Sequence, residues 1–215
     1  ISHIETLIEE GADIIDIGAE STRPGSDPIS IEEEINRLLP LLKVYKSRFT
    51  VPLSLDTSKS EVAEVGLDYG VDLINDVTGL KGDSNMASII SSYQVPVVLM
   101  HMNNTPKIMQ DNPSYDNVIA EVKSQLSDSI SIARAAGIVD IIIDPGIGFG
   151  KTLSHNLTLI KHLDQLTELS CPILIGTSRK SFIGQITGDS VDSRLEGTIV
   201  SSILAVLNKL SGKAD

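Results

Sequence analysis

Short apolar runs alternate with one-sided helical patterns along this chain. Three of the runs follow a glycine and a short polar step: GADIIDIG at 11–18, GVDLINDV at 70–77 and GIVDIIID at 137–144. Glycine is the usual residue just past a helix, because it accepts the left-handed conformation. The runs are rich in Ile, Val and Leu and do not strictly alternate, which is typical of strands buried on both faces of a parallel sheet. With PLSLDT at 52–57, VPVVLMH at 95–101 and CPILIGTS at 171–178, the pattern predicts six strands.

Helices are predicted between these runs. Three of them begin with the Ser-x-x-Glu spacing, in which two side chains satisfy two backbone donors at a helix N-terminus; the pairs are Ser30 and Glu33, Ser58 and Glu61, and Ser193 and Glu196. Pro40 predicts a kink or a break in the first of these helices. The longest helix is predicted over 115–136, with an apolar stripe of Val118, Val122, Leu126, Ile130 and Ala133. Strict alternation of strand and helix predicts parallel strands joined by right-handed crossovers.

The two ends of the chain favour a barrel over an open sheet. Residues 2–10 have a helical pattern with no strand before them, and GKAD at 212–215 repeats the helix-to-strand punctuation of residues 11–13. Six strands and one more implied at each end make eight, the number in a (β/α)₈ barrel of about 250 residues. We therefore predict one α/β domain over residues 1–215, a (β/α)₈ TIM barrel that lacks its first and last strands, from a protein that is longer at both ends.

Composition excludes several classes of partner. The 17 Lys and Arg against 29 Asp and Glu give a net charge of −12, which disfavours binding to nucleic acid. No apolar run approaches the ~18 residues of a membrane span. The one cysteine, Cys171, cannot form a disulfide within the chain. A reducing, cytoplasmic location is the expectation.

Polar residues stand where the predicted strands end, and in a barrel of this kind the active site gathers at the carboxyl ends of the strands. In chain order they are Asp16, Glu20, Ser21, Thr22, Arg23, Asp56, Thr57, Asn75, Asp76, His101, Asp144, Thr177, Ser178, Arg179 and Lys180, with the apolar Met100 directly before His101. For Asp16 and Asp76 a structural role is favoured, since each neighbours a better-placed group. The remaining residues predict a site at one mouth of the barrel.

The segment DPGIGFGKT at 144–152 resembles a phosphate loop only superficially. The phosphate-loop spacing requires glycine at 145, where Pro145 stands, and the dinucleotide fingerprint requires glycine at 151, where Lys151 stands. We expect a flexible glycine-rich turn that brings the backbone, or the ring of Phe149, close to a ligand. The four histidines show no paired spacing typical of metal ligands, and only His101 lies at the mouth.

Asp56, Asn75, Asp144 and Lys180 together suit a flat heterocycle. The carboxylates and the amide would accept hydrogen bonds from ring nitrogens and an exocyclic amine, and Lys180 would donate to a carbonyl on the opposite edge. Such a site discriminates strongly, because a wrong ligand leaves buried groups unpaired. Arg23, in a loop with Pro and Ser, could supply a positive charge for a phosphate or carboxylate. The residues indicate a pterin-type ring and an anionic co-substrate.

Seven motifs in order resemble the dihydropteroate synthase family: ESTRPG at 20–25, SLDTSKSEVA at 54–63, LINDVTG at 73–79, VVLMHM at 97–102, DPGIGFGKT at 144–152, GTSRKSFIG at 176–184 and EGT at 196–198. The resemblance implies an enzyme of folate synthesis, and a sulfonamide target. It would join para-aminobenzoate to 6-hydroxymethyl-7,8-dihydropterin pyrophosphate with release of pyrophosphate. The family also implies Mg²⁺ as a cofactor and a homodimer formed through the later helices, with Ile199, Ile203, Val206 and Leu207 as candidates.

The resemblance also assigns residues. Asp56, Asn75, Met100, Asp144 and Lys180 would bind the pterin. Thr22, Arg23 and Pro24 match a mobile loop, and Phe149, Lys180 and Ser181 match the aminobenzoate pocket. Asp56, Arg23 and Lys180 would be the catalytic residues. The family's Asn that helps to hold Mg²⁺, and its last-strand Arg-x-His motif, match no residue of this chain, so no metal ligand is assigned here.

Two alternatives remain open at this stage. A pterin-dependent methyltransferase shares the barrel and the Asp, Asn and Asp constellation, but its chemistry needs neither SRK at 178–180 nor STRPG at 21–25. A catalytically silent pterin-binding barrel is the other alternative. Release of pyrophosphate, measured with and without para-aminobenzoate, would separate the three.

Overall fold

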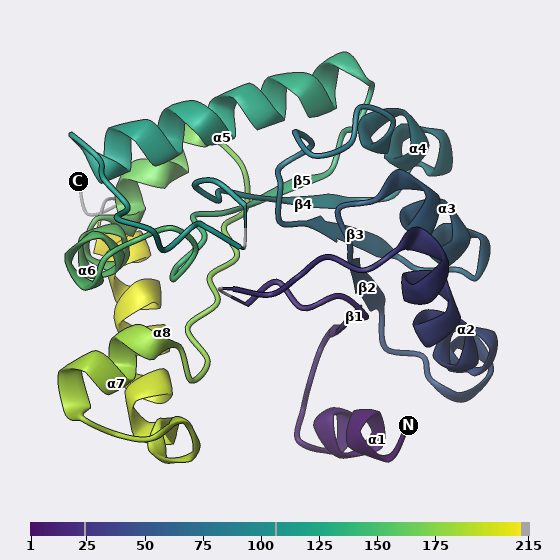
Figure 1. The fold of residues 1–215 in the computed structure, drawn as a ribbon, viewed down its shortest axis with the longest axis horizontal. Helices are drawn as coiled ribbons and strands as arrows, with labels where there is room; N and C mark the ends of the chain where they lie inside the picture. Colours follow the sequence, from purple (N-terminus) through teal and green to yellow (C-terminus); the bar gives the residue numbers. More distant parts are fainter. Residues whose placement is uncertain (24, 106, 212–215) are drawn as a thin grey trace. The chain divides into compact units, whose positions relative to one another are not determined.

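The computed structural model describes residues 1–23, 25–105 and 107–211, and these form two compact units. Unit 1 comprises residues 1–22, 26–99 and 129–141, and unit 2 comprises residues 23–25, 100–128 and 142–215, of which 212–215 lie outside the described residues. Figure 1 labels the helices and strands of both. The prediction of one domain over residues 1–215 stays a prediction.

Unit 1 contains four parallel strands in the order in which they occur in the chain. Its elements are α1 (Ser2–Glu9), β1 (Ile15–Gly18), α2 (Ile31–Arg48), β2 (Leu53–Asp56), α3 (Ser60–Asp68), β3 (Leu73–Asp76), α4 (Met86–Tyr93) and β4 (Val97–Met100), whose last residue belongs to unit 2. The strands pair in the order β1-β2-β3-β4. The helices α2, α3 and α4 pack in sequence beside them (Figure 1). Strand and helix therefore alternate as predicted.

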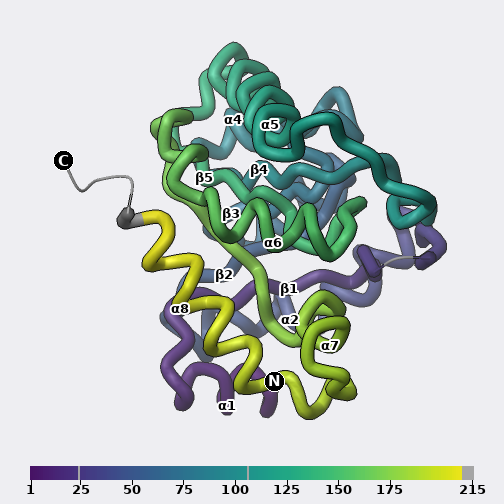
Figure 2. Tube along the Cα trace, turned by 90° about the vertical axis from the view of Figure 1, so that its left-hand side faces the viewer, coloured from purple at the N-terminus to yellow at the C-terminus, as the bar shows by residue number. Residues whose placement is uncertain are grey.

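Unit 2 carries the later helices. Its elements are most of α5 (Val118–Ala135), β5 (Ile141–Asp144) except its first residue, α6 (Leu153–Lys161), the 3₁₀ helix η1 (Leu163–Leu169), α7 (Ser181–Thr187), the short 3₁₀ helix η2 (Val191–Ser193) and α8 (Leu195–Ser211). The helices α6, α7 and α8 pack against one another, with α8 drawn in yellow in Figure 2. The amide of His101 donates to the carbonyl of Asp144 at 2.9 Å, which aligns the end of β5 with the residue that follows β4.

Buried aliphatic side chains form the core, as the Ile-, Val- and Leu-rich runs predict. The strand β4 is buried at every position, and the predicted stripe of α5 is buried throughout. Ser30 caps α2 by accepting a hydrogen bond from the amide of Glu33 at 3.1 Å, which confirms that helix start. Pro40 does not divide α2, which runs unbroken to Arg48.

Two predicted helix starts are wrong. The helix α3 begins at Ser60, and Ser58 is not its N-cap residue. The amide of Ser60 donates to the carboxylate of Asp83 at 2.8 Å and not to the side chain of Ser58. Ser193 lies in η2, and α8 begins two residues later at Leu195.

The predicted sixth strand over 171–178 is much shorter than expected. It is reduced to one parallel bridge between Ile143 and Ile173. Beyond that bridge the chain bonds to hydroxyl groups of α8: the hydroxyl of Thr177 lies 2.9 Å from that of Ser202, and the amide of Arg179 donates to the hydroxyl of Thr198 at 2.9 Å. These contacts take the place of a strand ladder. Among the described residues, no helix is both long and apolar enough to cross a membrane.

Candidate functional site

The ends of β2 and β3 bring two predicted site residues together in unit 1. Asp56 and Asn75 are partners in the parallel register, so their side chains leave adjacent strands at the same level. The amide nitrogen of Asn75 donates to Asp16 Oδ2 at 3.2 Å. Asp56 Oδ1 is buried, and among the described residues it has no hydrogen-bond partner. A buried acceptor without a donor is costly in a folded protein and suits a ligand that donates.

The charge state of Asp56 is set by its surroundings. Burial raises the pKa of Asp56 from its ordinary value of 3.8 to about 7, and the neighbouring carboxylates of Asp16, Asp76, Glu34 and Glu20 contribute to that rise. Near neutral pH this group therefore exists as both carboxyl and carboxylate. Donors on a bound ligand would favour the carboxylate.

A partly buried network of ion pairs lies near Asp56. Lys59 Nζ donates to Glu34 Oε2 at 2.6 Å and to the carbonyl of Ile29 at 2.8 Å, and lies 3.0 Å from Glu20 Oε2. Glu34 is fully buried and also accepts from the hydroxyl of Thr57 at 2.8 Å. Glu20 Oε1 accepts from the amide of Ile29 at 2.7 Å. Lys59 thus contacts both ends of the 20–29 segment, at Glu20 and at Ile29. This segment contains Thr22 and Arg23.

Asp76 has the structural role that was favoured for it. It is fully buried, and its two oxygens accept from the amide and hydroxyl of Thr78 and from the amide of Leu80. These bonds shape the turn after β3. Asp16 is exposed, and its contact with Asn75 orients an amide of the predicted site.

In unit 2, Asp144 lies at the end of β5 with a glycine-rich turn directly after it. Asp144 is buried, and its Oδ1 accepts from the amide of Gly146 at 2.7 Å. Burial raises the pKa of Asp144, and the charges of Lys180 and Lys151 and the Gly146 bond oppose that rise. Lys180 lies over the ring of Phe149, with Nζ 4.9 Å from the ring centroid. Three predicted residues, Asp144, Phe149 and Lys180, are thus brought together.

The glycine-rich turn is held more firmly than the sequence indicated. Four consecutive backbone carbonyls each accept a side-chain hydrogen bond: Ile147 from Lys180, Gly148 from Gln110, Phe149 from Lys151 and Gly150 from Tyr115. Gly146 has φ +68°, and a Cβ there would lie 1.9 Å from the carbonyl oxygen of His101. Only glycine fits that close approach. The expected flexible turn is instead a tightly bonded one.

Lys151 is a buried residue that the sequence analysis missed. In the sequence, Lys151 stands at the lysine position of a phosphate loop, and that spacing fails because Pro145 takes the place of the first glycine. The residue is 3% exposed, and its Nζ lies 2.9 Å from His101 Nδ1. Glu34 was missed as well, although its position four residues before Leu38 on the buried stripe of α2 is a signal that sequence reading could have used.

The other predicted residues differ in exposure. Thr22 is half-buried and Arg23 is exposed, while Pro24 lies outside the described residues. Met100 is buried as the last residue of β4, which suits an apolar wall. Ser181 is exposed as the first residue of α7.

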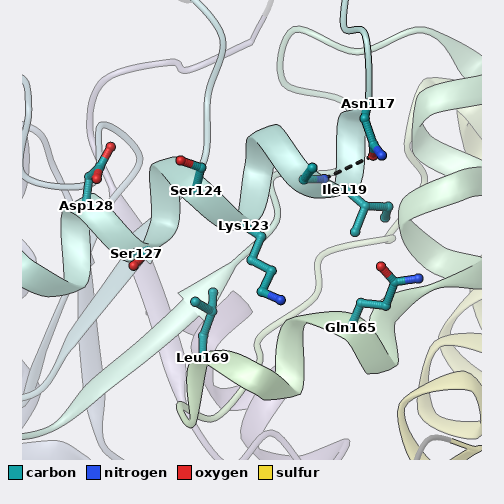
Figure 3. A pocket seen from close by; sticks show the side chains of 9 residues that line it. Asn117, Ile119, Lys123, Ser124, Ser127, Asp128, Gln165 and Leu169 are labelled. Carbon is teal, nitrogen blue, oxygen red and sulfur yellow. Dashed lines mark hydrogen bonds between the residues drawn. The ribbon is translucent and has the colours of Figure 1, made fainter.

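A groove of about 450 Å³ between α5 and η1 contains none of the predicted site residues. Figure 3 shows its lining, which includes Asn117, Lys123, Ser124 and Gln165. The amide of Ala120 donates to the side chain of Asn117, so this lining serves in part to cap α5. Among the described residues, no three His, Cys, Asp or Glu side chains are grouped to hold a metal ion.

Comparison with known proteins gives one consistent match. Residues 1–212 match a family model described as pterin binding enzyme. The chain is 44% identical over 209 residues to the dihydropteroate synthase of Clostridium beijerinckii, which covers 96% of this chain and 75% of the relative. It is 40% identical over 209 residues to the dihydropteroate synthase of Escherichia coli, covering 96% and 74%.

Solved structures agree. The Yersinia pestis dihydropteroate synthase in complex with a sulfonamide drug has a TM-score of 0.93 and 37% identity, over 97% of this chain and 76% of that chain. The Thermus thermophilus enzyme in complex with 4-aminobenzoate has a TM-score of 0.90 and 42% identity, over 96% and 79%. These similarities confirm the predicted fold class, the α/β TIM barrel.

Proposed function

Since this chain belongs to the pterin-binding enzyme family and, within it, to the dihydropteroate synthases, we propose that it joins para-aminobenzoate to 6-hydroxymethyl-7,8-dihydropterin pyrophosphate. In this transferase reaction the bond between the pterin methylene carbon and the pyrophosphate oxygen breaks. The amine nitrogen of para-aminobenzoate bonds to that carbon and loses a proton. The products are dihydropteroate, an intermediate of folate synthesis, and pyrophosphate.

Asp56 and Asn75 are proposed to bind the donor edge of the pterin. The buried Oδ1 of Asp56 is the single observation that carries this role, because among the described residues nothing donates to it. Ring N–H groups would supply the missing donor and would draw Asp56 into its charged form. A fixed carboxylate then stabilises positive charge that develops on the methylene carbon as pyrophosphate leaves.

Asp144 and Lys180 are proposed to bind polar edges of the pterin, with Met100 as an apolar wall. The buried Asp144 accepts, and Lys180, whose pKa burial lowers, donates. Phe149 and Ser181 are proposed to contact para-aminobenzoate, whose neutral amine is a competent nucleophile at neutral pH. Sulfonamides, one of which is bound in the Yersinia pestis relative, would compete there.

Thr22, Arg23 and Pro24 are proposed to act on the pyrophosphate end. Arg23 is exposed, and a guanidinium group can form paired hydrogen bonds to phosphate oxygens. The fastened ends of the 20–29 segment, at Glu20 and Ile29, would limit where Arg23 can reach.

The decisive experiment measures pyrophosphate release in a coupled assay, with and without para-aminobenzoate. Release that requires para-aminobenzoate is expected. Absence of pyrophosphate release both with and without para-aminobenzoate would contradict the proposed function. Methyl transfer to a corrinoid protein would favour the methyltransferase alternative. Asp144→Ala should weaken pterin binding severely in calorimetry, because it removes a buried acceptor. Asp128→Ala, at an exposed position of α5, serves as the control.

Mg²⁺ is proposed only as a companion of the pyrophosphate. The described residues do not form a ligand cluster for a resident ion. Mg²⁺ commonly keeps several waters and is held largely by substrate phosphates. When bound it would neutralise charge on the leaving pyrophosphate.

A homodimer and a cytoplasmic location are also proposed. The helix α8 exposes a row of large apolar side chains on unit 2; Ile199, Ile203, Val206 and Leu207 are each half or more exposed. Such a row is typical of an interface between subunits. Ile203→Glu should shift the mass in solution from dimer to monomer, as measured by light scattering, whereas Ile132→Glu on α5 should not.

A further inference from the structure

The Lys151 ammonium group is enclosed by acceptors within unit 2. Nζ lies 2.9 Å from His101 Nδ1, 3.3 Å from the carbonyl oxygen of His101 and 2.9 Å from the carbonyl oxygen of Phe149. When the proton of His101 is on Nε2, its Nδ1 accepts, and the three acceptors match the three N–H groups of an ammonium ion. Both Lys151 and His101 are 3% exposed, so water contributes little to solvating this charge.

The acceptors come from two different segments. His101 directly follows β4, and Phe149 lies in the glycine-rich turn after β5. One side chain therefore joins the end of β4 to the turn that carries Phe149. Gly146 allows the two backbones to approach this closely, because it has no side chain. A Cβ at position 146 would lie 1.9 Å from the carbonyl oxygen of His101 and 3.4 Å from Lys151 Nζ.

Charged neighbours give the contact a second effect. Burial lowers the pKa of Lys151 to about 7, Asp144 opposes that fall and Lys180 adds to it. In return the charge of Lys151 opposes the rise in the pKa of Asp144. The titratable groups that face Lys151 are thus Asp144 from β5, Lys180 from before α7 and His101 from after β4, with the ring of Tyr115 centred 6.1 Å from that of His101.

We propose that Lys151 is a positioning residue that holds the glycine-rich turn against the end of β4 and, together with Lys180, supplies positive charge that favours the Asp144 carboxylate. It touches no reacting atom in this scheme and acts through Asp144 and Phe149. The part that concerns ligand affinity rests on the proposed function, because Asp144 is there an acceptor for the pterin. The part that concerns charge and the turn does not depend on any ligand.

The first experiment follows the carboxyl carbon of Asp144 by NMR as the ligand-free protein is titrated. In Lys151→Met the titration midpoint should move upward, because a positive charge near the carboxylate is gone. Lys151→Arg should stay closer to the wild type, and Lys161→Met, on the exposed end of α6, should not differ from it. An unmoved midpoint in Lys151→Met would overturn the proposal.

If Lys151→Met does not fold, the titration is repeated with Lys151→Gln. Glutamine is neutral but still donates hydrogen bonds. The midpoint of Lys151→Gln should move upward relative to the wild type, while its amide hydrogens at residues 146–150 should exchange at rates close to those of the wild type. A residue that only packed the turn would raise exchange without moving the midpoint in either variant, and that result would contradict the charge role.

The second experiment measures pteroate affinity by calorimetry at several pH values. Lys151→Met should bind about tenfold more weakly or worse at neutral pH. As the pH is lowered, its affinity should begin to fall at a higher pH than that of the wild type, because Asp144 takes up its proton earlier. Equal affinity and an equal pH profile would contradict the proposal. Failure of the wild type to bind pteroate would instead contradict the proposed function, and the titration would still decide the role of Lys151.

Discussion

The free energy of unfolding of the wild-type protein is expected to fall as the pH rises toward 7, because Asp56 ionises. Asp56→Asn is expected not to show this fall. The folded protein holds the pKa of Asp56 at about 7, whereas in the unfolded chain this group should titrate near its ordinary value of 3.8. Between those values the unfolded state binds fewer protons than the folded state, so the free energy of unfolding falls as the pH increases. The stability is fully present below the lower value and lost above the higher one.

The magnitude follows from the same two values. At 1.36 kcal/mol for each pH unit, the interval from 3.8 to about 7 corresponds to an upper limit of about 4 kcal/mol. Between pH 5 and pH 8 the part that can be observed is about 3 kcal/mol. Asparagine has nearly the same shape and cannot ionise, so Asp56→Asn should lack this term.

Urea unfolding of both proteins at pH 5, 6, 7 and 8 measures the difference. The stability of Asp56→Asn relative to wild type should increase steadily with pH and level off above pH 7. Asp13→Asn, an exposed carboxylate of the same unit, is the control and should follow the wild type. If the wild-type and Asp56→Asn curves run parallel within the error of the extrapolation, the reasoning about Asp56 is refuted.

Three other perturbations have defined outcomes. Lys59→Met leaves the fully buried Glu34 carboxylate without its ion pair, which typically costs about 3–5 kcal/mol in urea unfolding; a loss below about 1 kcal/mol would show that the pair is solvated. Gly146→Ala places a methyl group 1.9 Å from the His101 carbonyl and should lower the melting temperature severely, whereas Gly11→Ala, also at positive φ but in open space, should cost only about 1–2 kcal/mol. EDTA should reduce pyrophosphate release without changing the melting temperature, and a lower melting temperature in EDTA would instead indicate a resident structural metal.

The alternating strands and helices could be predicted because a strand that is buried on both faces appears in the sequence as a short run rich in Ile, Val and Leu. The strand β4 lies within the predicted 95–101 run, and it is buried at all of its positions. The run at 171–178 carries the same kind of signal but forms only a bridge at Ile173. Apolar composition reports burial, while a strand also needs backbone hydrogen bonds to a neighbouring strand along its length. Here the hydroxyls of Ser202 and Thr198 bond to Thr177 and Arg179 instead.

Parts of the candidate site depend on contacts that no local pattern encodes. Lys151 and His101 are 50 residues apart in the chain, so their contact could not be read from either segment alone. The motif test at 144–152 could only exclude a phosphate loop. Glu34 differs, because its place on the stripe with Leu38, Leu42 and Tyr45 marked a charged residue on a buried face. Such a conflict between pattern and polarity is itself a sign of a polar network.

The four bonded carbonyls of residues 147–150 have a consequence for how ligands arrive. Side chains already donate hydrogen bonds to these four carbonyls, so the turn is pre-organised. When a ligand binds against the turn, the protein therefore loses little conformational entropy. Association at this wall should therefore proceed in a single kinetic phase without a slow isomerisation. Rigid inhibitors that complement its existing shape should gain more affinity than flexible ones of equal size.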